Sequence, residues 1–504
     1  MKIITKTFLF ISLFMISGLV IAQELPFRQV KISVLPELRP SFLKEGRLLL
    51  YLTTKGGKEP RFSSEVTIGI TPSGWDSSKT YTFDSGDKNI LHTDLAEGFM
   101  PVPHKYYYQA VYKQNPDDGQ INIPGNMFSK VDSVITSGPV TLNLQLNQLI
   151  PPYKIAENKF VMPVVIKSKF LSDFWGRARD LKASVLLPAG YFENSGRSYP
   201  ICYHAPGLNG RYTGVNEMMA NKEFSKWWFS GNAPQVIYVF LDSQGPYGDS
   251  YQVDSENNGP CGKALTEELI PEIEKQVHYK KDSHNRYLAG ASTGGWVVLG
   301  LQIFYPDFFD GAWAYSPDPV DFEHYGLINI YSDESAFINR FGYLQPESRT
   351  IYGEPKGSMK AAILDENVIS RTNTYVISGE QFGAYNAVFG PKGKDGLPSM
   401  LIDPKTGKID HQIATQWEKY DLKKVLQKNW TTLGPKLQGK IWIWTGDMDM
   451  LYSNVATRFL KMYLDKTENP KSDAKISFTS MAGHCAEWSD TAVLKMVAEK
   501  ASKK

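Results

Sequence analysis

The chain has 504 residues, which is too long for one ordinary hydrophobic core and indicates more than one domain. Hydrophobic residues make up 42% and charged residues 21%, a globular composition that excludes a disordered chain or a fibre. Lysine and arginine number 55 against 53 aspartates and glutamates, so the formal net charge is +2. This balance offers no electrostatic argument for a nucleic-acid partner.

The first 22 residues have the three parts of a cleavable export signal. Lys2 and Lys6 supply positive charge, an apolar stretch follows over 8–20, and small residues at a cleavage site end with Ala22. A membrane anchor is the alternative, but the apolar run is short for a span and no stop-transfer pattern follows it. We therefore expect removal of residues 1–22, an exported (periplasmic or secreted) protein, and no stable membrane span after cleavage.

Residues 23–152 have the pattern of a small all-β domain. Short β-rich runs recur, and turn formers such as Lys55-Gly56-Gly57 separate them. The expected strands are 30–34, 47–53, 66–70, 106–112 and 140–146. Short strands between turns, without helical periodicity, favour an immunoglobulin-like β-sandwich. Ile150-Pro151-Pro152 is a candidate linker, so we place the domain boundary after residue 152.

From residue 153 to residue 504 the pattern changes to strands that alternate with helices. Helical spacing is clearest over 263–279, where Leu265, Leu269 and Ile273 share one face. The other expected elements are strands at 182–187, 201–203, 235–242, 286–288, 311–315, 441–445 and 475–479 and helices at 294–304, 453–463 and 492–500. This alternation predicts an α/β domain with a mainly parallel sheet flanked by helices.

The interval from about 318 to 439 does not fit that alternation, because it has more residues than one crossover connection requires. It contains turn formers such as Gly390-Pro391, and a helix is expected over 412–427. We interpret the interval as an insertion over the catalytic face of the domain. An elaborate connection with no role beyond packing is the alternative.

The run Gly290-Ala291-Ser292-Thr293-Gly294 has the G-x-S-x-G spacing of a nucleophile elbow. The serine of an elbow lies on a sharp strand-to-helix turn, and glycines on either side let the neighbouring backbone pass without a Cβ clash. The pattern also occurs by chance, and a loop without chemistry is the alternative. Here a strand candidate precedes it and an apolar helix follows, which favours Ser292 as a nucleophile.

A serine hydroxyl needs a general base that a carboxylate holds in place. In this fold the chain order is serine, acid, histidine, each after a later strand. His484 lies in a loop just beyond the strand expected to end at Thr479 and is the candidate base. Two acids, Asp447 and Asp449, follow the strand expected to end at residue 445. We favour Asp449, because the turn presents it toward the carboxyl edge of the strand, and keep Asp447 as the alternative acid.

Ester hydrolysis also needs two backbone N–H groups that point at the developing oxyanion. One is expected to be the amide of Thr293, directly after the nucleophile. The second is expected in the loop 204–210, after the strand that ends at residue 203. We assign it to the amide of Leu208, with Gly207 as the alternative; a turn without this function would use the same glycines.

Together these segments resemble the putative-esterase family of α/β-hydrolases, which contains esterase D-like, enterochelin esterase-like and feruloyl or acetyl-xylan esterase-like proteins. The resemblance covers roughly the last two-thirds of the chain. The segments that carry it are Pro206-Gly207-Leu208-Asn209-Gly210, Asp254–Pro260, Leu265–Glu274, Ala289–Gly295, Tyr305–Phe309 and Gly483-His484. Cys261 departs from the family pattern, in which we expect a bulky aromatic residue.

The resemblance implies an α/β-hydrolase fold for residues 153–504, with Ser292, Asp449 and His484 as a catalytic triad and the Leu208 and Thr293 amides as oxyanion donors. The implied reaction is cleavage of a carboxylic ester through an acyl-enzyme, without a metal or organic cofactor. The substrate is a small-molecule or glycan ester, for example a carbohydrate-linked acetyl or feruloyl ester or an enterochelin-type siderophore. Acyl transfer in place of hydrolysis stays open.

Two functions of other classes stay open. The first is a catalytically inactive protein that binds a glycan or another ligand on a hydrolase scaffold, against which the intact set of triad candidates argues. The second is a serine peptidase, although the sequence has no acidic cluster to capture a free peptide amine. The N-terminal domain is expected to be an accessory module or to mediate homo-oligomer formation.

Aromatic and sulfur-containing side chains near the expected site have two interpretations each. Trp227-Trp228, Trp296 and Trp488 would either stack on a sugar or phenolic group or pack in the core, and packing is the more common role. Of the three cysteines, Cys261 and Cys485 would either form a disulfide or remain thiols, and we expect thiols.

Overall fold

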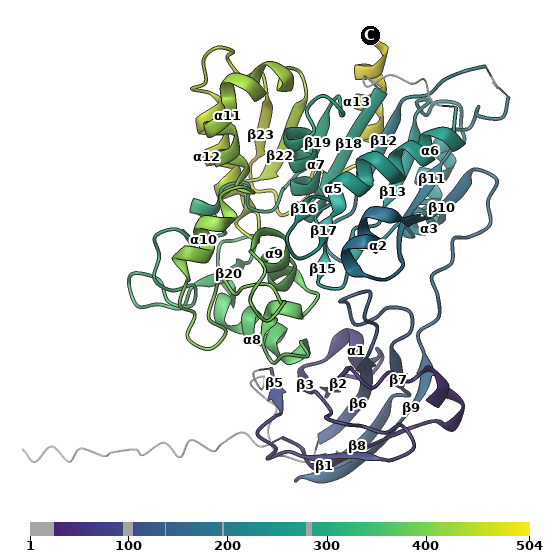
Figure 1. Ribbon diagram of the computed structural model, residues 1–504, viewed down its shortest axis with the longest axis vertical. Helices are drawn as coiled ribbons and strands as arrows, with labels where there is room; N and C mark the ends of the chain where they lie inside the picture. Colours follow the sequence, from purple (N-terminus) through teal and green to yellow (C-terminus); the bar gives the residue numbers. More distant parts are fainter. Residues whose placement is uncertain (1–24, 94–103, 137, 194–195, 279–284, 504) are drawn as a thin grey trace, which may run out of the picture.

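The computed structural model describes residues 25–93, 104–136, 138–193, 196–278 and 285–503. The predicted signal segment 1–22 lies outside these described residues. Their strands form two main sheets, and we call residues 25–149 the β-lobe and residues 161–503 the α/β-lobe. Figure 1 shows the lobes stacked along the longest axis of the molecule. Within the described ranges, no helix is both long and apolar enough to cross a bilayer.

Each strand expected in the β-lobe overlaps an observed one, and shorter strands and helical turns lie between them. The elements are β1 (Phe27–Val34), η1 (Pro36–Ser41), β2 (Arg47–Thr53), α1 (Pro60–Ser63), β3 (Val66–Ile70), β4 (Tyr81–Asp84), β5 (Leu91–His92), β6 (His104–Lys113), β7 (Met127–Ser129), β8 (Asp132–Thr136) and β9 (Val140–Leu149). In β1, Val30, Ile32 and Val34 are buried and the residues between them are not, which is the period-two burial of a strand.

The strands of the β-lobe follow the order β4-β1-β9-β7-β6-β2-β3-β5, and β8 pairs with β6. β1 and β9 pair in parallel, whereas the other pairs in this part of the described chain are antiparallel. The sheet is therefore mixed, and the immunoglobulin-like sandwich stays a prediction.

The mainly parallel sheet expected in the second part of the chain is present. Its order is β10-β11-β13-β12-β18-β19-β22-β23. The strands are β10 (Val161–Ser168), β11 (Arg179–Leu186), β12 (Ile201–Ala205), β13 (Ile237–Leu241), β18 (Arg286–Ala291), β19 (Ala312–Tyr315), β22 (Ile441–Gly446) and β23 (Lys475–Thr479). β11 is antiparallel to both of its neighbours, and every pair from β13 to β23 is parallel.

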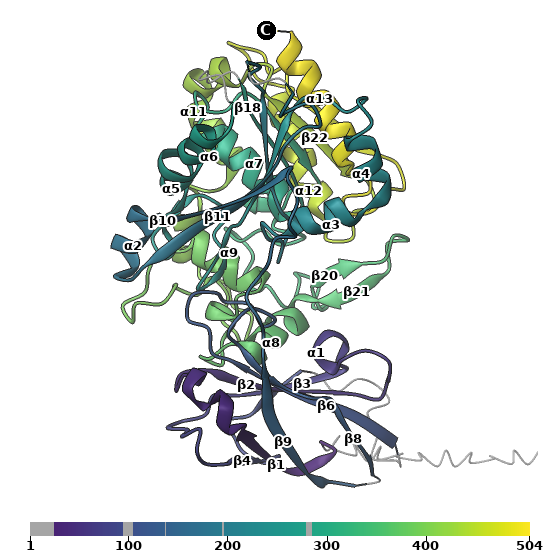
Figure 2. The same ribbon diagram turned by 90° about the vertical axis from the view of Figure 1, so that its right-hand side faces the viewer.

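Helices cover both faces of this sheet (Figure 2). The residues of β12 are buried on both faces of the sheet, because Ile201 and Tyr203 lie in one apolar cluster and Cys202 lies in another. The helices that contribute to the first cluster include α5 (Cys261–Ala264), η2 (Leu265–Leu269), α6 (Ile270–Gln276), α7 (Thr293–Phe304), α11 (Leu422–Leu437) and α12 (Ser453–Leu464). Those of the second cluster are α3 (Gly214–Ala220), α4 (Lys222–Trp228) and α13 (Asp490–Ser502). Shorter elements lie near the carboxyl edge: α2 (Lys169–Trp175), β14 (Gln244–Gly245), β15 (Gly248–Asp249), β16 (Asp254–Ser255) and β17 (Gly259–Pro260).

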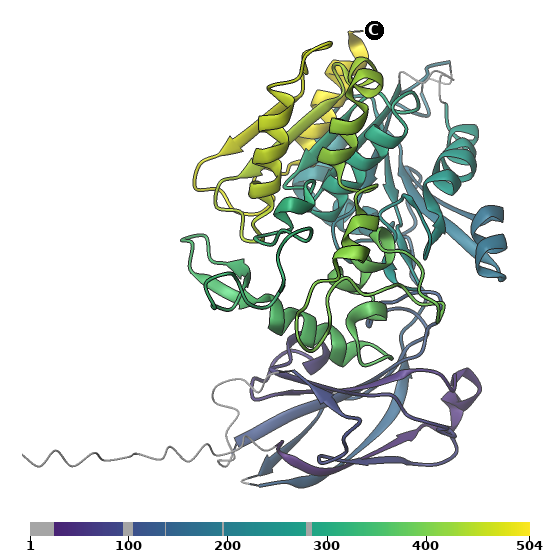
Figure 3. The ribbon, with the colours of Figure 1, turned by 60° about the vertical axis from the view of Figure 1, so that its left-hand side comes forward.

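The interval after β19 forms a layer of its own within the α/β-lobe, and Figure 3 shows its green segments between the β-lobe and the main sheet of the α/β-lobe. Its elements are η4 (Phe322–His324), β20 (Pro346–Arg349), β21 (Pro355–Ser358), α8 (Met359–Ile369), η5 (Tyr375–Ile377), α9 (Gln381–Phe389) and α10 (His411–Trp417). α8 contacts β3 and β5 of the β-lobe. The layer therefore contacts the β-lobe, and along the chain it lies between β19 and β22.

The helix expected over 412–427 is instead two helices, α10 and α11. The break has a local cause, because the side chain of Asp421 accepts a hydrogen bond from the amide of Lys424 and caps the start of α11. α11 packs against α7, so it is the crossover helix between β19 and β22. The additional residues of the insertion thus lie before α11.

Candidate active site

Ser292 lies on a sharp turn between β18 and α7. Its backbone angles are φ 56° and ψ −124°, a conformation that L-residues rarely adopt and that is typical of strained functional positions. A Cβ atom on Gly290 would lie within 3.0 Å of the Gly294 carbonyl, and one on Gly294 would lie within 3.0 Å of the carbonyl of Ala205 in β12. Both glycines are therefore required by close backbone contact, as the elbow pattern predicts.

Two backbone hydrogen bonds attach the elbow to the segment that follows β19. The amide of Ser292 donates to the carbonyl of Tyr315 at 2.9 Å, and the amide of Asp318 donates to the carbonyl of Ser292 at 3.3 Å. The loop that carries His484 contacts the same segment after β19, because the amide of Cys485 donates to Ser316 Oγ at 3.0 Å. Ser292 and His484 are 192 residues apart in sequence, and both of their loops contact the segment at the end of β19.

His484 lies beside a buried carboxylate. Its Nδ1 is 2.8 Å from Oδ2 of Asp449, which is 0% exposed, and Oδ1 of Asp449 accepts from the amide of Leu451 at 2.9 Å. Burial disfavours the imidazolium, but the hydrogen bond and charge of Asp449, with contributions from the neighbouring Cys485, raise the pKa of His484 overall. The other ring nitrogen, Nε2, is buried without a hydrogen-bond partner among the described residues. A base oriented in this way has one nitrogen left to accept a proton.

The side chain of Asp447 has a different partner from that of Asp449, although both residues follow β22. Its carboxylate pairs with Arg458 of α12 and is partly exposed. Its backbone carbonyl accepts from Nδ2 of Asn454 at 3.0 Å. The geometry therefore favours Asp449 over Asp447 as the partner of His484.

Arg349 of β20 holds the loop that carries Asp449. Its Nε donates to the carbonyl of Asp449 at 2.9 Å, and its guanidinium also donates to the carbonyl of Asp447 at 3.2 Å. Its backbone amide donates to the carbonyl of Met450 at 2.9 Å. Sequence reasoning missed this residue, because an arginine 100 residues before the acid, inside an insertion, belongs to no local motif.

The loop after β12 lies against the elbow. A Cβ on Gly207 would be 3.9 Å from Cβ of Ser292, so this loop is adjacent to the serine. Asn209 has φ 64° and follows Leu208, and the amide of Gly210 closes a turn onto the carbonyl of Gly207 at 2.9 Å. Within the described chain, the amides of Leu208 and Thr293 donate to no backbone carbonyl. Both groups are free to serve as hydrogen-bond donors in the way expected of an oxyanion hole.

A buried polar cluster lies behind Thr293, and sequence reasoning missed it as well. Oδ2 of Asp318 accepts from Tyr251 Oη at 2.6 Å and from Thr293 Oγ1 at 2.9 Å. Nε2 of Gln381, at the start of α9, donates to Tyr251 Oη at 2.6 Å. Burial raises the pKa of Asp318, and these hydrogen bonds oppose the shift. The cluster connects the first residue of α7 to the insertion.

The aromatic and sulfur-containing side chains considered above are mostly structural. Trp228 and Trp296 are completely buried in the core, so neither is available to stack on a substrate. All three cysteines are free thiols, so Cys261 and Cys485 form no bridge. Burial raises the pKa of the Cys261 thiol to about 12, which keeps it protonated and unreactive at neutral pH.

Three possible metal ligands, Asp321, Glu323 and His324, approach one another within the described residues. A lysine already supplies the positive charge there, because Lys423 Nζ lies 2.6 Å from Asp321 Oδ2 and 2.9 Å from Glu323 Oε2. The donor set is therefore satisfied by an ion pair, and this cluster does not fit a metal centre.

Comparison with known proteins identifies relatives for the α/β-lobe. The family model described as putative esterase matches residues 177–488, which is more than half of the chain. A ferulic acid esterase is 17% identical, with 68% of this chain and 97% of that chain covered and a TM-score of 0.38. An S-formylglutathione hydrolase from Agrobacterium tumefaciens is 13% identical, with 69% and 98% covered and a TM-score of 0.39. The fluorophosphonate-binding serine hydrolase FphF of Staphylococcus aureus is 13% identical, with 68% and 98% covered and a TM-score of 0.40. None of the curated proteins compared with the chain matches it.

Proposed function

The chain belongs to the putative-esterase family, has the α/β-hydrolase fold and is a carboxylic ester hydrolase, and from this premise we propose that Ser292, His484 and Asp449 are its catalytic triad. The observation that carries the proposal is the buried hydrogen bond between Asp449 Oδ2 and His484 Nδ1, which leaves Nε2 of the same ring without a partner among the described residues. A histidine held in this way is a general base for a neighbouring serine.

The reaction proceeds by acyl transfer to the serine. Oγ of Ser292 attacks the ester carbonyl carbon while Nε2 of His484 accepts its proton. The negative oxygen of the tetrahedral intermediate accepts hydrogen bonds from the amides of Thr293 and Leu208. The intermediate collapses, the carbon–oxygen bond to the alcohol breaks, and His484 donates its proton to the leaving alkoxide. Water then attacks the acyl-enzyme by the reverse route, which releases the acid and restores the serine.

Asp449 orients the histidine and stabilises the imidazolium that forms in each step. Its complete burial makes the interaction strong, because the carboxylate is not solvated by water. Its second oxygen is held by the amide of Leu451, so the carboxylate cannot rotate away from the ring. The ring is therefore kept in the tautomer in which Nε2 accepts a proton.

We propose a carbohydrate-linked acetyl or feruloyl ester as the substrate, on the ground that the family includes esterases of such compounds. An enterochelin-type siderophore ester is the second candidate. Export through cleavage after Ala22 and an immunoglobulin-like fold for the β-lobe belong to the same proposal, since secreted carbohydrate esterases carry such modules. A screen of acetyl, feruloyl and siderophore esters against the purified protein decides between the substrates, and N-terminal sequencing of the mature protein tests the cleavage site.

The proposed nucleophile is tested with Ser292→Ala in the full chain. We expect wild-type protein to cleave a p-nitrophenyl ester and to be labelled by a fluorophosphonate probe, and the variant to do neither. Wild-type ester cleavage by the variant would refute the assignment. Absence of labelling in folded wild-type protein would instead favour an inactive ligand-binding protein.

A further inference from the structure

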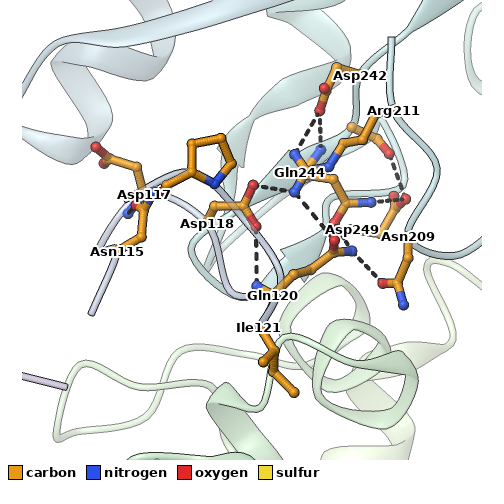
Figure 4. A network of polar contacts seen from close by, with 12 residues as sticks. Asn115, Asp117, Asp118, Gln120, Ile121, Asn209, Arg211, Asp242, Gln244 and Asp249 are labelled. Atoms are coloured by element: carbon orange, nitrogen blue, oxygen red, sulfur yellow. Dashed lines mark hydrogen bonds and ion pairs between the residues drawn. The ribbon is translucent and has the colours of Figure 1, made fainter. Parts of the chain in front are cut away.

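A loop of the β-lobe reaches the edge of the candidate active site. It connects β6 to β7 and lies against the segment that follows β12, as Figure 4 shows. Nε2 of Gln120 donates to Oδ1 of Asn209 and, at 2.9 Å, to Oε1 of Gln244. Asp118 pairs with Arg211. Asn209 and Arg211 are the first and third residues after Leu208, so the loop holds the segment that carries one proposed oxyanion donor.

Three glycines make this contact possible. Gly119 of the β-lobe, Gly248 of β15 and Gly379 of the insertion meet backbone against backbone, and we call them the glycine junction. A Cβ on Gly119 would lie 2.8 Å from both Gly248 N and Gly379 Cα, and one on Gly379 would lie within 3.0 Å of the Gly119 carbonyl. The amide of Gly119 also donates to the carbonyl of Gly245 at 2.8 Å. Side chains at these positions would force the three segments apart.

The insertion continues from the glycine junction to both proposed oxyanion donors. Glu380, next to Gly379, accepts from Nδ2 of Asn209 at 3.4 Å. Gln381 follows, and its Oε1 lies 3.4 Å from Thr293 Oγ1, which donates to the nearer Asp318. Consecutive residues of the insertion thus contact the neighbour of Leu208 and the side chain of Thr293.

Buried cations also attach the β-lobe to the insertion near the glycine junction. Lys113, at the end of β6, donates to the carbonyl of Ser378. Nε of Arg47, in β2, donates to the carbonyl of Val368 at 2.8 Å. Both side chains are buried, and burial lowers the pKa of Lys113 to about 8. A buried cation is costly unless it is hydrogen-bonded, so these bonds favour one orientation of the β-lobe, although Nη2 of Arg47 has no partner among the described residues.

We infer that the β-lobe is a positioning element of the active site. Through the glycine junction and Gln120 it holds the two segments that supply the oxyanion amides, Leu208 and Thr293, at the spacing that the transition state requires. The inference rests on the proposed function, because it assumes those two amides as donors. Gln120 is a positioning residue, since it acts on the reaction through Asn209.

The test uses full-length protein with Gln120→Leu, which removes the hydrogen bonds to Asn209 and Gln244 and the one accepted from Arg211 and keeps a similar volume. We expect kcat to fall roughly 10-fold to 100-fold, because a displaced oxyanion donor weakens binding of the transition state. KM and the pH profile of kcat/KM are expected to stay at wild-type values, because neither the substrate nor the triad is touched. Labelling by a fluorophosphonate, which needs the same amides, is expected to slow in parallel.

Gly119→Ala is the second variant, and Gly86→Ala is its matched control, because a Cβ on Gly86 meets nothing within 4 Å. We expect kcat to fall in Gly119→Ala and to stay at the wild-type value in Gly86→Ala. If Gly119→Ala does not fold, the decision rests on Gln120→Leu. Wild-type kcat in a folded Gln120→Leu variant, or a change confined to KM, would overturn the inference.

The two proposals fail in different ways. Residual wild-type activity of Ser292→Ala would refute the proposed triad itself. Loss of activity in Ser292→Ala together with wild-type kcat in Gln120→Leu would leave the triad intact and remove only the positioning role of the β-lobe.

Discussion

Asp449 and His484 form a hydrogen bond of 2.8 Å in which the carboxylate is 0% exposed. Asp447, two residues earlier, pairs instead with Arg458 at the surface. The same short loop therefore presents one acid to the interior and one to solvent.

Asp449→Asn and Asp447→Asn are a matched pair that separates the two acids. For Asp449→Asn we expect kcat to fall by roughly 10³-fold to 10⁴-fold, because an amide stabilises the wrong histidine tautomer. For Asp447→Asn we expect activity within about twofold of wild type, because only an exposed ion pair is lost. Steady-state hydrolysis of a p-nitrophenyl ester measures both. The reverse ranking would make Asp447 the triad acid.

The pH dependence of kcat/KM reports the protonation of His484 in the free enzyme. Asp449 raises the pKa of the imidazole above its ordinary value of 6.5, and only the neutral ring accepts the serine proton. We therefore expect the acid limb of the wild-type profile to lie above pH 6.5, with activity increasing as the pH rises through it. In Asp449→Asn the contribution of the acid is lost and those of burial and Cys485 remain, so the residual activity should show its limb at lower pH. An unchanged limb in that variant would contradict the assignment.

Arg349→Met tests whether the insertion positions the acid. The substitution keeps the apolar stem but removes the hydrogen bonds to the carbonyls of Asp449 and Asp447. We expect kcat to fall roughly 10-fold to 100-fold with little change in KM, because the carboxylate is no longer held against the imidazole. Arg340→Met, at an exposed position of the same insertion, is the control and should retain activity. Equal activity of the two variants would show that the acid loop keeps its conformation without Arg349.

Lys423→Met tests the buried ion pair that occupies the possible metal cluster. Asp321 is 0% and Lys423 7% exposed, so the substitution leaves a buried carboxylate whose remaining partner that can carry positive charge is His324. We expect the free energy of unfolding to fall by about 3–5 kcal/mol in urea titrations. Lys428→Met, which removes an ion pair to Glu418 from a 61% exposed lysine, should change stability by less than about 1 kcal/mol. Similar losses in both variants would argue that Lys423 contributes no more than a surface lysine.

Local patterns in the sequence predicted a large part of this protein. The elbow is readable because its physical requirement, glycines two residues before and after the serine, lies within Gly290–Gly294. The order of the strands along the chain is readable because burial on a sheet imposes apolar runs and helices impose a period of 3.6 residues. The helix expected over 412–427 was wrong, since the cap formed by Asp421 overrides the continuity of the apolar pattern.

Contacts between segments that are far apart in the sequence could be identified only from the tertiary structure. The sequence favoured Asp449 but left Asp447 open as the alternative acid, and burial of Asp449 against His484 distinguishes the two in the structure. Arg349 acts on a loop 100 residues away and Gln120 on one 89 residues away, so neither leaves a trace in any short window of sequence. By itself the sequence predicted the reaction class and the proposed nucleophile, because these depend on neighbouring residues. Only the tertiary structure shows which acid contacts the histidine and which lobe contacts the loop that carries Leu208, because hydrogen bonds and burial depend on three-dimensional proximity.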